Sequence, residues 1–220
     1  MEIVKVICLV ETPFNKRDHA RFGIQVLEKN GFQVEVWDIS TVLHPDVHAR
    51  VRVPDPIDPF HYHLLKSEQE VLAAIATLPD SCFVISNVAY HYTSWSIYHA
   101  LSRKDIPYGI PITNSVPTGS NNINLTSRVT NLLPLTLGRL FWALFRRTPF
   151  AGWGIRPPKV LIAGGEQSIM DRWWPKNLIS RQTDILWTHT LDYDIYLKAK
   201  EEKNATPVDL HRGVFLDEYF

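Results

Sequence analysis

The chain has 220 residues, of which 45% are hydrophobic and 21% are charged, a balance that is ordinary for one large globular domain. Lysine plus arginine equals aspartate plus glutamate at 23 each, so the formal net charge of zero argues against nucleic acid as a partner. The two cysteines, Cys8 and Cys82, lie in apolar runs, which excludes a disulfide framework and indicates small buried core residues.

The beginning of the chain predicts one β–α–β unit. The β-branched run 4–10 predicts a strand that is buried on both faces. Asp18 predicts the cap of a helix that reaches Leu27, and residues 33–39 predict a second strand. The crossover between the two strands should be right-handed, as it is in nearly all parallel units.

The rest of the chain continues the same alternation after a proline-rich interruption. Residues 44–62 predict an irregular excursion with a short edge strand at 49–53, because four prolines exclude a long helix. Ser67 then predicts the cap of a helix. Further strands are predicted at 81–86, 107–112, 159–163, 184–187 and 213–216, and further helices at 93–103, 127–147 and 192–200.

Strands that alternate with helices predict an α/β fold of Rossmann-like type. We expect a doubly wound, mostly parallel sheet of about six to seven strands, with helices on both faces, as a single domain over residues 1–220. Ligands of such sheets bind beyond the carboxyl ends of the strands, at the topological switch point. The loops that follow predicted strands are 11–17, 87–92, 113–124, 164–168 and 188–192.

The loop after the first strand is the most informative of these. Backbone amides at the start of a helix attract anions, and Lys16 or Arg17 can add a phosphate contact. The absence of G-x-G-x-x-G and Walker A sequences disfavours a dehydrogenase or a P-loop enzyme. The alternative is a set of solvated first-turn residues with Asp18 as a plain cap. The candidate substrate-binding residues of this loop are Thr12, Asn15, Lys16, Arg17 and His19.

The pair Gly164-Gly165 ends the predicted strand 159–163 and is the second candidate. Two glycines allow a ligand to approach the backbone closely, and Glu166 stands beside them. The alternative is a tight turn that needs positive φ, with Glu166 exposed to solvent. Both interpretations stay open, and all three residues enter the candidate substrate-binding set.

His189 follows the predicted strand 184–187 and is the candidate catalytic base. Asp192 and Asp194 resemble a metal-binding carboxylate pair, but their place at a helix start favours capping. We therefore expect no metal and no cofactor. The remaining paired or isolated histidines are expected to be structural or surface residues, and they include His44, His48, His61, His63 and His91.

The stretch 132–147 is apolar for most of its length and ends in Arg146-Arg147. This pattern suits a peripheral contact with the inner face of a membrane, although a buried packing helix is the favoured alternative. The first residues lack the basic start and cleavage site of a signal peptide, and no apolar stretch reaches about 18 residues. We therefore expect a cytoplasmic protein.

Several passages of the sequence resemble the N-terminal half of a GT-B glycosyltransferase. They are KVICLVETPF at 5–14, VEVWD at 34–38 and ILWTH at 185–189. The passage GVFLDE at 213–218 is similar to one in bacterial surface-polysaccharide transferases. GT-B enzymes join two Rossmann-like domains around a cleft. The N-terminal domain generally holds the acceptor, and the C-terminal domain holds most of the nucleotide-sugar site.

The resemblance implies a transferase domain of polysaccharide biosynthesis that brings a glycan or lipid-linked acceptor to a nucleotide sugar. His189 would deprotonate the acceptor, and the first loop with Gly164-Gly165 would form one wall of the cleft. The C-terminal domain would be missing from these 220 residues, which would then be inactive alone. The alternatives are half of a nucleotide-sugar epimerase of the related two-domain fold and a non-catalytic Rossmann-like ligand-binding or assembly domain.

Overall fold

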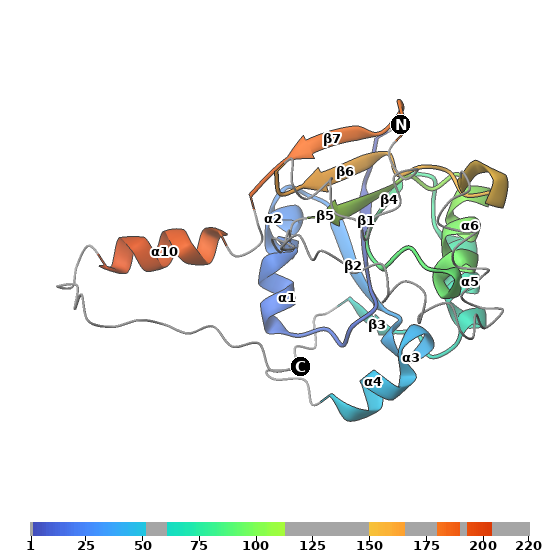
Figure 1. Ribbon diagram of the computed structural model, residues 1–220, viewed down its shortest axis with the longest axis horizontal. Coiled ribbons are helices and arrows are strands. Elements are labelled where there is room, and N and C mark those ends of the chain that lie inside the picture. The colour runs from blue at the N-terminus through green and yellow to red at the C-terminus, as the bar shows by residue number, and fades with distance from the viewer. Residues whose placement is uncertain (1, 52–60, 113–149, 166–179, 190–192, 204–220) are drawn as a thin grey trace, which may run out of the picture.

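The seven strands form one sheet in the order β3-β2-β1-β4-β5-β6-β7, and every neighbouring pair is parallel (Figure 1). The computed structural model describes residues 2–51, 61–112, 150–165, 180–189 and 193–203. This architecture confirms the predicted Rossmann-like α/β fold. The strands are β1 (Lys5–Val10), β2 (Gln33–Asp38), β3 (Tyr62–Leu64), β4 (Cys82–Asn87), β5 (Tyr108–Ile112), β6 (Val160–Ala163) and β7 (Asp184–Trp187).

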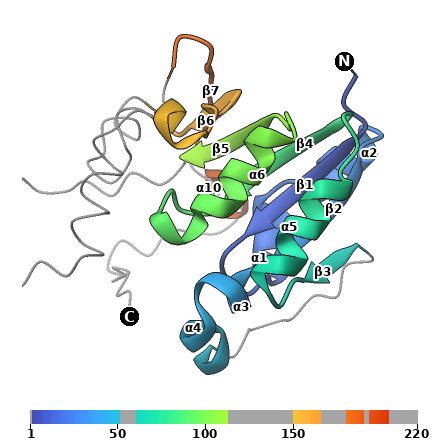
Figure 2. The same ribbon diagram turned by 90° about the vertical axis from the view of Figure 1, so that its right-hand side faces the viewer.

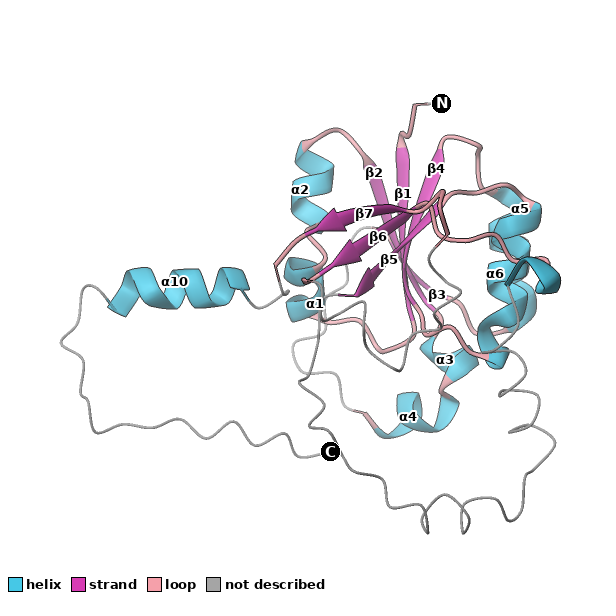
Figure 3. Cartoon of the chain, turned by 45° about the horizontal axis from the view of Figure 1, so that its top comes forward, coloured by secondary structure: helices cyan, strands magenta, loops and turns pink. Residues whose placement is uncertain are grey.

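Helices cover both faces of the sheet, as the alternating sequence predicts. Figure 3 shows α1 and α2 on one side of the strands and α5 and α6 on the other, and Figure 2 shows α5 and α6 side by side. The α-helices are α1 (Lys16–Arg21), α2 (Ile24–Lys29), α3 (Ser40–Leu43), α4 (Pro45–Arg50), α5 (Glu68–Thr77), α6 (Trp95–Arg103) and α10 (Tyr193–Lys203). Two 3₁₀ turns are η1 (Tyr92–Ser94) and η2 (Phe150–Trp153).

The central strand β1 separates two hydrophobic cores. Its alternate residues point to opposite faces, so Ile7 joins the core under α5 and α6 while Cys8 joins the core under α1 and α2. Both faces are buried, which explains the unbroken apolar run of this strand. The predicted burial of the cysteines is confirmed, since Cys8 and Cys82 are fully buried free thiols.

The predicted helix from Asp18 to Leu27 is wrong in its start and its continuity. Asn15 provides the cap of α1, because its side chain accepts a hydrogen bond from the amide of Asp18. Gly23 then adopts a φ of 64°, which ends one helix and starts α2. Two short helices therefore replace one long one.

The predicted edge strand at 49–53 is also wrong over the residues that the structure describes. Pro45 starts the short helix α4, which runs to Arg50, because proline suits the first turn of a helix. The edge strand is β3 instead, where Tyr62 pairs with Val36 of β2. The predicted cap at Ser67 is confirmed by its hydrogen bond from the amide of Glu70.

Several predictions fall outside the described part of the chain. They concern the loop 113–124, the helix 127–147 with its proposed membrane contact, and the strand 213–216. Glu166 and Asp192 also lie outside it. Within the described ranges, no helix has the length and apolar character needed to cross a bilayer.

Candidate functional site

The strand order places the topological switch point between β1 and β4. From β1 the chain proceeds to β2 and β3 on one side, and then crosses to β4, β5 and the remaining strands on the other. The loops after β1 and β4 therefore diverge, and this is where doubly wound sheets open a crevice for ligands. The register pairs Val10 with Asn87, so Glu11 and Val88 are the first residues beyond the two strands.

Glu11 and His44 form a carboxylate–imidazole pair at this point. Oε2 of Glu11 accepts a hydrogen bond from the backbone amide of Ala89 at 3.1 Å and lies 3.5 Å from Nε2 of His44. The side chain of Glu11 is 20% exposed and that of His44 is 45% exposed. The pair is therefore partly shielded yet accessible, and it bridges the loops that follow β1, β2 and β4.

Asp38 holds the backbone that carries this pair. Its carboxylate is fully buried and accepts hydrogen bonds from the amide of Phe14 at 3.3 Å, the amide of Ser40 at 2.8 Å and the hydroxyl of Tyr62 at 2.8 Å. The start of α3 is thereby fixed, and the amide of His44 donates to the carbonyl of Ser40 at 2.8 Å. An acidic residue at the end of β2 can bind a ribose in dinucleotide-binding folds, but here the chain itself occupies both oxygens.

His91 follows β4 and faces the same edge of the sheet. The amide of Thr93 donates to Nδ1 of His91 at 3.4 Å, so the neutral ring carries its proton on Nε2. The amide of His91 donates to Oγ of Ser94 at 3.1 Å, which completes a capping box. Burial, aided by the neighbouring His44, holds the pKa of His91 below its ordinary value. His91 is therefore a neutral hydrogen-bond donor at neutral pH.

A second donor lies beneath these side chains. Nδ2 of Asn87 is enclosed, and in the described part of the chain it has no hydrogen-bond partner. Asn87 is the last residue of β4 and lies opposite Val10 of β1. Enclosed donors are normally paired, so this one is available to a ligand or a water molecule.

Buried tyrosines fix the loop after β4. The hydroxyl of Tyr98 donates to the carbonyl of Val88 at 2.6 Å and accepts from Oγ of Ser86 at 2.8 Å. Burial raises the pKa of Tyr98 well above its ordinary value, so this hydroxyl keeps its proton. The ring of Tyr90 stacks on that of Tyr98 at a centroid distance of 4.2 Å. Buried tyrosine side chains therefore hold the loop that carries Ala89 and His91 in place.

The predicted residues of the first loop divide between structural and exposed positions. Oδ1 of Asn15 accepts from the amide of Asp18 at 3.0 Å, so Asn15 is engaged as a cap. The ring of His19 lies 6.4 Å from that of Phe14 in an edge-on arrangement. Arg17 belongs to α1, and its side chain lies outside the described part. Thr12 and Lys16 are exposed.

The other predicted residues lie near the far edge of the sheet. Gly165 has a φ of 113°, which a glycine tolerates, and the adjoining Gly164 donates its amide to the carbonyl of Ile112 at 3.0 Å. His189 is exposed and stacks on Tyr193 at a centroid distance of 4.2 Å. Three strand-to-strand steps of about 4.8 Å separate β1 from β6, or about 14 Å. The structure therefore brings the loops at 164 and 188 together and leaves the first loop apart.

Glu11, His44 and His91 are not among the site residues that the sequence predicts. The loop 87–92 is among the loops expected to follow strands, but nothing in its composition shows that β4 lies beside β1. His44 is isolated in a proline-rich segment, and it reaches the site only through α3. Knowledge of the strand order is the signal that would have found all three.

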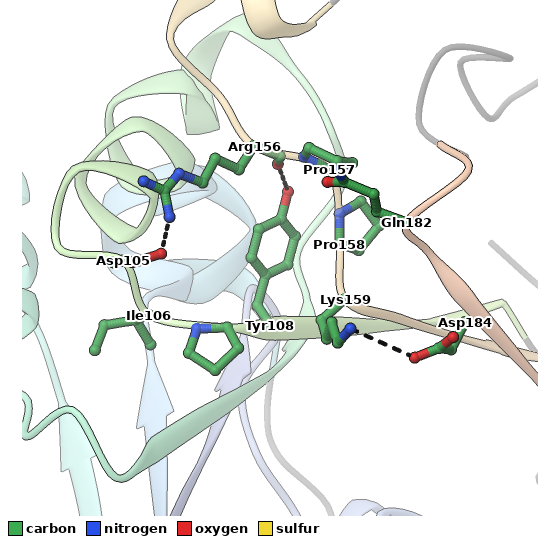
Figure 4. A pocket seen from close by; sticks show the side chains of 10 residues that line it. Asp105, Ile106, Tyr108, Arg156, Pro157, Pro158, Lys159, Gln182 and Asp184 are labelled. Carbon is green, nitrogen blue, oxygen red and sulfur yellow. Dashed lines mark hydrogen bonds and ion pairs between the residues drawn. The ribbon is translucent and has the colours of Figure 1, made fainter. Parts of the chain in front are cut away.

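A separate cavity of about 620 Å³ lies at the opposite, amino-terminal edge of the sheet (Figure 4). Arg156 forms an ion pair with Asp105 there, and Nζ of Lys159 lies 3.7 Å from Asp184. Each of these cations faces a carboxylate, so the four side chains add no net charge. The cavity also lies away from the carboxyl ends of the strands, where ligands of this fold bind. The switch point is therefore the better candidate site.

Within the described ranges, no three histidine, cysteine, aspartate or glutamate side chains gather as metal ligands. No family model matches the sequence, and no curated protein matches it either.

Two solved structures are similar to this chain at low identity. The UDP-GlcNAc 2-epimerase from Neisseria meningitidis, bound to UDP-GlcNAc, has a TM-score of 0.42 and 14% identity over 92% of this chain and 51% of its own. A putative UDP-N-acetylglucosamine 2-epimerase from Listeria monocytogenes has a TM-score of 0.32 and 15% identity over 80% of this chain and 41% of its own. This chain thus spans about half the length of these structures or less. Likeness at this level does not assign a function.

Proposed function

We propose that this chain is the acceptor-side Rossmann-like domain of a GT-B type glycosyltransferase, which moves a sugar from a nucleotide sugar to a glycan or lipid-linked acceptor. The observation that carries the proposal is the Glu11–His44 pair at the switch point. An acceptor hydroxyl becomes a nucleophile when a base takes its proton, and an imidazole oriented by a carboxylate is suited to that task. The resemblance of residues 5–14 and 34–38 to the opening of GT-B enzymes supports the same assignment.

The geometry suggests how the proton moves. Nε2 of His44 faces Oε2 of Glu11, and among the described residues no hydrogen bond involves Nδ1 of His44. Nδ1 would accept the proton of the acceptor hydroxyl while its oxygen bonds to the anomeric carbon of the donor sugar. The bond between that carbon and the phosphate oxygen breaks, and the nucleotide leaves with the bonding electrons. Glu11 stabilises the imidazolium that forms.

Two further groups would orient the sugars in this proposal. The Nε2 proton of His91 and the side-chain NH₂ group of Asn87 are donors beside the Glu11–His44 pair. Donors of this kind bind sugar hydroxyls. The nucleotide sugar would be held mainly by a second Rossmann-like domain, as the resemblance implies. No metal is needed for these steps.

The test measures transfer of labelled sugar from UDP-, GDP- or CDP-sugars to lipid-linked glycans, using the whole protein that carries this chain. His44→Ala should lower the transfer rate by about 100-fold or more, which is the typical contribution of a general base. His63→Ala is the matched control, because His63 also faces a carboxylate, at 3.7 Å from Glu35, but lies on the edge strand β3. It should keep the wild-type rate.

Two results would contradict the proposal in different ways. If His189→Ala abolished transfer while His44→Ala did not, the base would be the residue predicted from sequence, and the switch-point pair would not be catalytic. If the nucleotide sugar were epimerised and no sugar reached any acceptor, the transferase assignment itself would fail. Product analysis by mass spectrometry and NMR separates the two.

The proposed site of action is the cytoplasmic face of a membrane, where a lipid-linked acceptor would be met through residues 132–147. These residues lie outside the described part of the chain. Co-sedimentation with liposomes that contain anionic lipid should fall when Arg146 and Arg147 are both changed to glutamate. Unchanged co-sedimentation would exclude this contact.

A further inference from the structure

The edge strand β7 exposes apolar side chains on both faces of the sheet. Ile185 is 38% exposed, Leu186 is 56% exposed and Trp187 is 52% exposed. Ile185 and Trp187 are paired with Leu161 and Ala163, which are fully buried on the same face. Apolar side chains therefore continue from the buried strand β6 to the exposed strand β7.

The outer edge of β7, which pairs with no strand in the described part of the chain, also presents backbone groups that can pair with a strand. The amides of Asp184 and Thr188 donate to the carbonyls of Lys159 and Ala163, just before β6 and at its end, at 2.9 Å in both cases. Because backbone groups alternate in direction along a strand, the amides and carbonyls of Ile185 and Trp187 point away from β6. Among the described residues, no strand lies beyond β7 to receive them.

Within the described ranges, β7 lacks the usual protection of an edge strand. Natural edges carry lysine, proline or a bulge that prevents pairing with another chain. Residues 185–187 contain none of these, and the register with β6 is continuous from Asp184 to Trp187. An exposed, regular and apolar edge of this kind is a template for a partner strand.

We propose that this edge is the interface of a symmetric homodimer, in which β7 of one copy pairs antiparallel with β7 of a second copy. A twofold axis perpendicular to the sheet keeps each face continuous across the interface. With the axis at Leu186, the two Leu186 side chains face each other. Ile185 then lies opposite Trp187 of the second copy, and the reverse pair is equivalent. The seven-stranded sheets of the two copies would join as one continuous sheet.

This register satisfies both the hydrogen bonds and the side chains. Ile185 and Trp187 both direct their backbone groups outward, so each cross-strand pair exchanges two hydrogen bonds. If the second strand slid by two residues in one direction, Asp184 would lie opposite Leu186. If it slid by two residues in the other direction, Ile185 would lie opposite His189. A shift by an odd number of residues would place side chains opposite each other that point to different faces of the sheet. Of these registers, only the one centred on Leu186 places Ile185, Leu186 and Trp187 all opposite apolar side chains.

Cysteine cross-linking tests the register directly. Leu186→Cys should form a disulfide between two copies under mild oxidation, because residues opposite each other in a non-hydrogen-bonded pair have Cα atoms about 4.5 Å apart. Ile185→Cys should not cross-link with itself, since its counterpart lies two residues along the strand. The native thiols give little background. Burial raises the pKa of Cys8 to about 12 and that of Cys82 to about 11.

Sedimentation analysis of the full chain tests the association itself. The wild-type chain should have twice the monomer mass, and Leu186→Lys should be a folded monomer because two ammonium groups would meet at the axis. Val26→Lys is the matched control, since Val26 on α2 is 62% exposed and lies far from β7. It should remain dimeric. A monomeric wild-type chain, a dimer that survives Leu186→Lys, or cross-linking by Ile185→Cys in place of Leu186→Cys would each overturn the proposal.

Discussion

Asp38→Asn is the substitution that tests most sharply how the candidate site is held. The asparagine keeps the shape of the side chain but replaces one carboxylate oxygen with an NH₂ group. In the native protein Oδ1 accepts from the amide of Ser40, while Oδ2 accepts from the amide of Phe14 and the hydroxyl of Tyr62. An NH₂ group at Oδ2 would face two donors, and only the hydroxyl can turn to accept.

The expected loss follows from these contacts. The amide of Phe14 would be left unpaired in a buried site, at about 1–3 kcal/mol, and the remaining hydrogen bonds would lose the assistance of the charge. We expect the free energy of unfolding to fall by about 2–4 kcal/mol, since the fully buried carboxylate has no water to replace its donors. For a domain of this size the melting temperature should fall by about 4–16 °C.

Urea unfolding of four proteins gives the measurement: wild type, Asp38→Asn, Tyr62→Phe and the double variant. The coupling free energy between Asp38 and Tyr62 should be about 1 kcal/mol, because Tyr62→Phe removes a charge-assisted hydrogen bond from the wild type but only a neutral one from Asp38→Asn. A loss below about 0.5 kcal/mol for Asp38→Asn, which is the range of a neutral surface change, would refute the anchoring role.

Three further predictions concern the buried tyrosines below the loop after β4, the titration of His91, and the packing of Gly154. Tyr98→Phe should lower the free energy of unfolding by about 2–4 kcal/mol in urea titration, because it leaves Oγ of Ser86 and the carbonyl of Val88 without the hydroxyl that pairs with them. Tyr90→Phe, which removes a hydroxyl 3.0 Å from that of Tyr108, gives the comparison for the loss of a neighbouring buried hydroxyl. His91 has a lowered pKa, so the unfolded chain binds the proton more tightly. Stability should therefore fall as the pH drops below about 6.5. His91→Asn should flatten this dependence, and an unchanged slope would exclude it. Gly154→Ala should destabilise by about 1–3 kcal/mol in thermal unfolding, because φ is 72° and the new Cβ would lie 2.9 Å from the ring of His99.

The sequence predicts most strands well because their signal is local. The runs 4–10 and 184–187 are apolar or β-branched, and the structure has β1 and β7 there. The strand β3 has only three residues and so carries no periodic signal. The residues 49–53 do alternate like a strand, yet Pro45 starts a helix whose last residue is Arg50. Helix initiation overrides the alternation at that position.

The order of the strands explains why the candidate site could not be predicted. It depends on which crossover passes over which face, and this is decided by tertiary packing rather than by any short segment. Glu11, His44 and His91 are far apart in the sequence, and only the adjacency of β1, β2 and β4 unites their loops. By contrast, Gly164 and His189 were each recognisable as residues that follow a strand, and the structure places both there.

The number of hydrogen bonds that each accepts distinguishes the two carboxylates at the ends of neighbouring strands. Both Glu11 and Asp38 stand at the carboxyl edge of the sheet, and sequence alone gives no reason to rank them. Asp38 is fully buried and already accepts three hydrogen bonds, so a ligand could reach it only by displacing the chain's own donors. The side chain of Glu11 is 20% exposed and accepts a hydrogen bond from the backbone amide of Ala89, beside His44. The capacity to bind or to move a proton therefore lies with Glu11, and Asp38 provides the rigidity that keeps the pair in place.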